Sequence, residues 1–117
     1  MTEEKARELG RLIGQSAEYQ AVRATSDALN GDPDAVATLR RMEELRVEAQ
    51  RMIQRGESPA EVMEEELDQL LGKVQANITY QRAVAAQENF DKTMLRVNEW
   101  ILDGIKRGAE SRIITLG

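Results

Sequence analysis

The sequence predicts an all-α fold of about five helices, with a long antiparallel helical hairpin that assembles into an oligomeric bundle. Three observations predict it. Apolar residues recur three and four positions apart over most of the 117-residue chain, which is typical of amphipathic helices. N-cap residues, prolines and glycines stand where these periodic segments begin and end. No segment of useful length alternates strictly between apolar and polar residues, so we expect no strand.

Two helices are predicted in the first 30 residues. Leu9 and Ile13 lie four positions apart and place apolar side chains on one face of the first helix. Ser16 is suited to cap a second helix that begins at Ala17, because its hydroxyl can accept a hydrogen bond from a backbone amide of the first turn. Gly31 is a helix stop, so the second helix should end just before it.

The third helix is predicted to begin at Pro33, with Asp32 as its N-cap. Proline suits the first helical position because its missing amide hydrogen has no partner there in any case. The helix should end at about Arg55, because Gly56 can adopt the left-handed conformation that ends many helices.

The fourth helix is predicted to run from Pro59 to about Ala76. Ser58 and Glu61 stand three residues apart and form a capping-box pattern at its start. The loops around 30–33 and 56–58 are short, and short loops between long helices favour antiparallel neighbours.

The fifth helix is predicted to be the longest, from about Thr79 to Arg107. Its apolar residues form one nearly unbroken seam, and a few large side chains lie off that seam. Side chains off the seam, together with methionines at helical spacing, are candidate interface residues, with burial in the core as the alternative. The seam consists of Ala83, Ala86, Phe90, Met94, Val97, Ile101 and Ile105. The candidate interface residues are Leu95, Trp100, Leu102, Met42 and Met63.

The chain is expected to form a single helical domain over residues 1–117. We expect residues 1–5 and 108–117 to be frayed tails, and residues 113–116 have a docking peptide for a partner as their alternative role. No apolar run is long enough to cross a membrane, and the acidic start of the chain does not resemble a signal peptide. These features predict a cytoplasmic protein.

The composition excludes several kinds of site. Histidine and cysteine are both absent, so the chain has no thiol nucleophile, no imidazole base and no His/Cys zinc or iron–sulfur ligands. No catalytic motif is found. We therefore expect a non-enzymatic protein without a metal or cofactor. The formal net charge of −5 argues against direct nucleic-acid binding.

Two local clusters suggest alternative functions. The Arg40–Arg55 face of the third helix carries five arginines and could contact RNA, although glutamates alternate with them and no aromatic residue lies nearby. Glu61, Glu65 and Asp68 share one face of the fourth helix and could bind a metal ion. The competing explanation is that acidic residues stabilise the positive end of a helix.

Several short motifs follow one another in a fixed order over about residues 6–105: Ala6-x-x-Leu9-Gly10-x-x-Ile13-x-x-Ser16-x-Glu18-Tyr19, Asp32-x-Asp34-Ala35, Gly56-Glu57-Ser58-Pro59, Asn77-x-x-Tyr80, Ala86-Gln87-Glu88-x-Phe90 and Val97-Asn98-x-x-Ile101. In their order, spacing and turn positions they resemble the YlbF/YmcA family of small bacterial helical proteins, to which the YheA-type proteins are related.

The resemblance implies an all-α hairpin that dimerises or forms higher oligomers and has no catalytic role. Family members act in a small complex that influences competence, sporulation and biofilm formation, and they are linked to an endoribonuclease. Some share an iron–sulfur cluster held by cysteines, which this cysteine-free chain cannot hold. We therefore expect a helical adaptor that self-associates and binds a related family member or an endoribonuclease. The alternatives are an RNA-binding protein and a purely structural, self-assembling protein.

Overall fold

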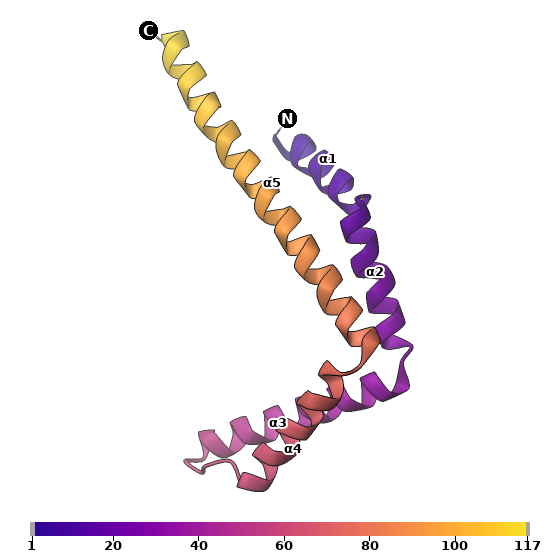
Figure 1. Ribbon diagram of the computed structural model, residues 1–117. Coiled ribbons are helices and arrows are strands. Elements are labelled where there is room, and N and C mark those ends of the chain that lie inside the picture. The colour runs from indigo at the N-terminus through magenta and orange to yellow at the C-terminus, as the bar shows by residue number, and fades with distance from the viewer. Residues whose placement is uncertain (1, 117) are drawn as a thin grey trace.

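All five helices of the computed structural model are α-helices, and the structure describes residues 2–116, with side chains through residue 110. The helices are α1 (Thr2–Gly14), α2 (Ala17–Asn30), α3 (Pro33–Gln54), α4 (Glu61–Gln75) and α5 (Ile78–Leu116), as Figure 1 shows. The prediction of an all-α chain with five helices is confirmed for the described residues. Oligomeric assembly stays a prediction.

The helices form two pairs that meet at an elbow (Figure 1). In one pair α2 packs along α5, and in the other α3 packs along α4, each pair running antiparallel. The molecule extends over 69 × 37 × 21 Å and has a radius of gyration of 21.7 Å. A compact domain of this length would have a radius of gyration of about 13 Å. The chain therefore leaves an unusually large share of its apolar residues at the surface.

The short loops have different effects at the two places where we expected antiparallel neighbours. The loop after α3 does return the chain along α3, as predicted. The loop at 31–32 instead turns α3 away from α2, and α5 is the helix that runs alongside α2 (Figure 1). A short loop fixes where the next helix begins, but the direction of that helix depends on what its first turn contacts.

Asp32 and Asn77 determine that direction at the elbow. Asp32 Oδ1 accepts from the Ala35 amide at 3.2 Å and caps α3. Asn77 Oδ1 accepts from the Tyr80 amide at 3.0 Å and caps α5 in the same way. The Asn77 amide nitrogen also donates to Asp32 Oδ2 at 3.1 Å. The two helix starts are thus joined directly through their capping side chains.

The predictions for two further helix boundaries, the start of α2 and the end of α3, are confirmed. Ser16 Oγ accepts from the Tyr19 amide at 3.2 Å and caps α2. Gly56 follows α3 with a φ of 78°, in the left-handed region. The Gly56 amide donates to the Ile53 carbonyl at 3.0 Å and the Glu57 amide to the Met52 carbonyl at 2.8 Å. This pair of bonds is the Schellman arrangement, which satisfies carbonyls at a helix end.

The predicted start of α4 is wrong. The helix begins at Glu61 with Ala60 as its N-cap, and no side chain caps it. Ala60 has an extended backbone (φ −67°, ψ 145°), so Ser58 lies two residues before the cap position. The Ser58 hydroxyl therefore cannot form the predicted capping box with Glu61, because that box requires the serine itself to be the N-cap.

The residues that we expected to be frayed tails are helical where the structure describes them. Residues 2–5 belong to α1 and residues 108–116 to α5. Glu3 and Glu4 lie in the first turn of α1, where carboxylates favour the positive helix end, and Glu3 also pairs with Arg7. Met1 and Gly117 lie outside the described residues, as do the side chains of 111–116, on which the docking-peptide alternative depends.

The buried core is small and divided between the two pairs. The Tyr19 and Phe90 rings lie 5.4 Å apart between α2 and α5. Val97 is the last buried residue along α5 in the described part. Within the α3–α4 pair and the elbow, the buried apolar side chains are those of Ala35, Leu45 and Val74.

Candidate protein-interaction surface

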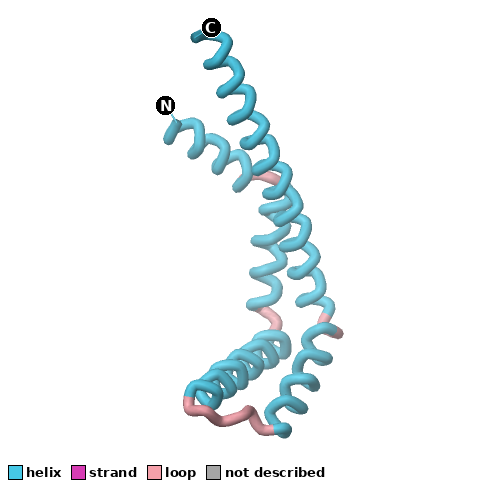
Figure 2. The backbone as a smooth tube through the Cα atoms, turned by 90° about the vertical axis from the view of Figure 1, so that its left-hand side faces the viewer, coloured by secondary structure: helices cyan, strands magenta, loops and turns pink. Residues whose placement is uncertain are grey.

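The second half of α5 has no neighbour over most of its length. Every described side chain from 98 to 110 is exposed. α2, which covers the first half of α5, has 14 residues, whereas α5 has 39. α1 does not continue that cover, because the chain bends between α1 and α2 and α1 leans away from α5 (Figure 2). The exposed part of α5 thus begins where the α2–α5 pair ends.

Large apolar side chains gather on this exposed stretch. Of the predicted interface residues, Trp100 and Leu102 lie here, 67% and 58% exposed, and Leu95 lies just before the buried Val97, 63% exposed. Ile101 and Ile105, which we expected in the internal seam, are also exposed, at 44% and 61%. We call these five residues the distal α5 surface.

The distal α5 surface is too wide for a helix with a single neighbour. At about 100° per residue, its apolar arc from Trp100 round to Leu95 covers about 220° of the helix circumference, interrupted by Asn98. A helix on the surface of a globular protein needs an apolar stripe of only about 100°. The remaining arc carries charges of both signs, namely Arg96, Glu99, Asp103, Lys106 and Arg107. The arrangement can bury apolar area against one or more further helices.

The sequence prediction missed Ile101 and Ile105 because it followed periodicity alone. Periodicity shows which residues share a helix face, but it does not show whether another helix covers that face. The relevant signal was the length of the elements. A second helix of about 14 residues cannot cover an apolar seam that extends over a much longer fifth helix.

The two methionines in the predicted interface do not belong to this surface. Met42 and Met63 are both half-buried and lie on α3 and α4. The α3–α4 pair is at the opposite end of the molecule from the free end of α5 (Figure 1). The predicted set is therefore divided between two surfaces, because helical spacing does not reveal which end of an extended fold a residue occupies.

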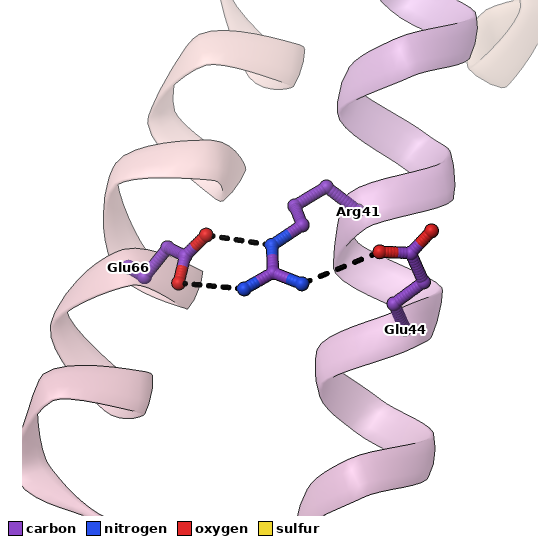
Figure 3. A network of polar contacts seen from close by, with 3 residues as sticks. All are labelled: Arg41, Glu44 and Glu66. Atoms are coloured by element: carbon purple, nitrogen blue, oxygen red, sulfur yellow. Dashed lines mark hydrogen bonds and ion pairs between the residues drawn. The ribbon is translucent and has the colours of Figure 1, made fainter.

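Arginines of the predicted RNA-binding face form ion pairs with neighbouring carboxylates. Arg41 reaches across to α4, where its Nε and Nη2 donate to the two oxygens of Glu66 at 2.7 and 3.1 Å (Figure 3). Its Nη1 donates to Glu44 at 3.3 Å. The hydrogen bonds from Arg41 lower the pKa of Glu66. The hydrogen bonds to Glu66 and Glu44 in turn raise the pKa of Arg41. The Arg41 guanidinium therefore links α3 to α4.

Two more arginines of the same face are similarly engaged. Arg46 donates to both oxygens of Glu43, at 2.9 and 2.5 Å, and lowers the pKa of that carboxyl. Arg55 lies 3.5 Å from Glu57. These pairs reduce the positive potential that phosphate binding requires. For the acidic alternative, the side chains that the structure describes, through residue 110, include no group of three or more carboxylates placed to hold a metal ion, so Glu61, Glu65 and Asp68 do not form one.

Comparison with known proteins identifies the family. The family described as "Control of competence regulator ComK, YlbF/YmcA" matches residues 2–106. The chain belongs to the YlbF/YmcA family. This confirms the resemblance drawn from the sequence motifs. The YlbF/YmcA match extends from α1 through the five residues of the distal α5 surface, so that surface lies in the region shared with the family. No curated protein matches the chain. Within the described residues, no helix combines the length and apolarity needed to span a bilayer.

Proposed function

We propose that this YlbF/YmcA-family regulator is a non-enzymatic, cytoplasmic adaptor that binds other helical proteins through its distal α5 surface. A second copy of the chain is one occupant of that surface. A further protein, either a related family member or an endoribonuclease, completes a regulatory complex. The observation that carries the proposal is the exposed apolar arc of the distal α5 surface, which no helix in the described part of the chain covers.

The energetics support docking at this surface. Fully burying one large apolar side chain contributes about 1.5–3 kcal/mol. The five residues are 44–67% exposed, so docking can bury roughly half of each side chain, and together they supply a driving force within the range of the free-energy cost of association. Trp100 is the most exposed of the five, and tryptophan is enriched among the residues that dominate binding energy. The mixed charges on the remaining arc of α5 keep that side of the helix in water.

Membership of the family supports a regulatory role. The family description concerns control of a competence regulator, and it names no reaction. The ion pairs of Arg41, Arg46 and Arg55 argue against the alternative in which the Arg40–Arg55 face binds RNA directly. A purely structural self-assembling protein is distinguished from an adaptor by whether a second kind of protein binds.

The test is affinity capture of the tagged protein from its own cells, with and without nuclease treatment, with bound proteins identified by mass spectrometry. The variant Trp100→Gln with Leu102→Gln should lose the captured partner. The control Val62→Gln removes an exposed apolar side chain of α4 and should retain it. Capture of the same partner by all three proteins would contradict the proposal. Recovery of the chain alone would support the structural alternative, and loss of the partner on nuclease treatment would support the RNA alternative.

A further inference from the structure

A second apolar surface lies at the other end of the molecule, between α3 and α4. A groove of about 380 Å³ opens there, and mostly apolar side chains of both helices line it. Leu45 lies beneath it, 2% exposed, whereas Ile53 and Leu67 lie at its mouth, 62% and 37% exposed. Ala49 and Met63 complete the apolar lining that we call the α3–α4 groove.

The groove is long enough for about two turns of a bound helix. Leu45 and Ile53 are eight residues apart on α3, which corresponds to about 12 Å, or slightly more than two helical turns. A helix laid along such a groove presents apolar residues at positions i, i+3, i+4 and i+7, as in known helix-in-groove complexes. An extended peptide would instead need unpaired backbone groups, which the walls of two complete helices do not offer.

The two walls of the groove differ in charge. On α4, Glu64, Asp68 and Glu61 follow Leu67 round the helix at about 60°, 100° and 120°, so they form an acidic ridge beside the groove. In the described part of the chain, none of these three carboxylates forms a side-chain hydrogen bond or ion pair. Across α4 as a whole, five carboxylates stand against one lysine.

The α3 wall is close to neutral. Gln50 lines it, and Arg46 is paired with Glu43 through two hydrogen bonds. An occupant of the groove therefore meets negative charge along one edge and little net charge along the other. Like-charge contact at an interface is costly, whereas complementary charge gives specificity and orientation.

We propose that the α3–α4 groove binds an amphipathic helix of a partner protein that carries basic residues along one edge of its apolar stripe. The apolar stripe covers Ile53 and Leu67, and the basic edge lies against Glu64 and Asp68. This surface is separate from the distal α5 surface, at the opposite end of the molecule (Figure 1). One chain can thus hold two different helical partners at once.

The direct test uses designed helical peptides as probes, with binding followed by fluorescence anisotropy. The first peptide has leucines at i, i+3, i+4 and i+7 and lysines along one edge of that stripe. The second is identical except that glutamates replace the lysines. The lysine peptide should bind, and the glutamate peptide should bind at least tenfold more weakly. Equal binding of the two peptides, or binding of neither, would overturn the proposal.

Variants of the full chain locate the binding site. Glu64→Gln with Asp68→Asn should weaken binding of the lysine peptide about fivefold at low salt, since exposed charge pairs are individually weak and are screened by salt. The matched control, Glu65→Gln with Glu88→Gln, removes two carboxylates away from the groove and should leave affinity unchanged. Ile53→Ser should weaken both the apolar contact and the binding. An identical loss in the control variant would show that overall charge, rather than the groove, attracts the peptide.

The Ile53→Ser variant also tests whether a second copy of the chain occupies the groove. Ile53→Ser should leave the sedimentation behaviour of the protein unchanged, because the occupant comes from another protein. If Ile53→Ser dissociates an oligomer of the chain, the groove is an interface between copies and the proposal is wrong. This outcome is distinguishable from failure of the distal α5 proposal, which depends on Trp100 and Leu102.

Discussion

The Asn77 amide nitrogen lies 3.1 Å from Asp32 Oδ2, and this hydrogen bond joins the capping side chains of α3 and α5. Each residue also caps its own helix: Asp32 accepts from the Ala35 amide through its other oxygen, Oδ1, and Asn77 accepts from the Tyr80 amide through its single side-chain oxygen, Oδ1. At the elbow between the two helix pairs, the N-termini of α3 and α5 are therefore joined by a hydrogen bond between their capping side chains. The angle of the elbow determines how far the α3–α4 groove lies from the distal α5 surface.

Asn77→Ala should destabilise the protein by about 1–2 kcal/mol, because it removes the cap of α5 and leaves Asp32 without its partner. Chemical denaturation followed by circular dichroism measures the change. Asn89→Ala on the exposed side of α5 is the control and should change stability by less than about 0.5 kcal/mol. Equal effects of the two substitutions would show that the elbow bond contributes little.

Stability should fall at acidic pH because two carboxyl groups at helix contacts have lowered pKa values. The Ala35 amide and the Asn77 side chain lower the pKa of Asp32 below its ordinary value of 3.8, and Arg41 lowers that of Glu66 below 4.5. A group whose pKa is lower in the folded state stabilises the fold above its unfolded pKa. That contribution is lost as the pH falls from about these ordinary values through the folded ones.

The acid-dependent loss can be assigned by mutation. Asp32→Asn keeps an oxygen that can cap α3 but removes the titrating carboxyl, so the fall in stability below pH 4 should be shallower than in the wild type. The measurement is the midpoint of denaturation as a function of pH. An unchanged slope would contradict a role for Asp32 in the acid response.

Arg41 and Glu66 should show energetic coupling because their two hydrogen bonds join α3 to α4. A double-mutant cycle with Arg41→Gln and Glu66→Gln measures the coupling in the free energy of unfolding. The pair Arg46 and Glu43 lies within α3 and serves as the comparison. The coupling energy should be larger for the Arg41–Glu66 pair between helices. A larger coupling energy for the Arg46–Glu43 pair within α3 would contradict the claim that Arg41 links α3 to α4.

Glycine substitutions should have opposite effects at two positions. Gly56 has a φ of 78°, so Gly56→Ala forces a left-handed conformation on alanine and should destabilise the protein by about 1–2 kcal/mol. Gly10 lies inside α1, and a Cβ there would meet no atom within 4 Å. Gly10→Ala should therefore stabilise by up to about 1 kcal/mol. Thermal denaturation of both variants measures this difference in sign.

Much of the fold follows from local chemistry that the sequence displays. Ser16, Asp32 and Gly56 mark helix boundaries because each acts within one turn of its own position. The start of α4 was mispredicted because the chain is still extended at Ala60, and Ser58 matches a capping pattern that the backbone does not adopt. The cap at Asn77 was missed, although an asparagine three residues before Tyr80 was visible as a motif.

The candidate surfaces were harder to predict because they depend on contacts between distant segments. Periodicity placed Ile101 in a seam with Val97, but only Val97 lies under a neighbouring helix. Met42 and Met63 were grouped with Trp100 by residue type, and the elbow places them far from it (Figure 1). The direction of α3 after residue 32, which no local pattern encodes, causes this separation.

The most direct test of the central claim is the mass of the protein in solution, measured by sedimentation velocity over a range of concentrations. The wild type should associate beyond its 13.2 kDa monomer. Trp100→Gln with Leu102→Gln should sediment as a monomer with unchanged helicity, whereas Val62→Gln should associate like the wild type. A wild type that is monomeric at every concentration, or a double variant that still associates, would contradict the claim that the distal α5 surface is an interface.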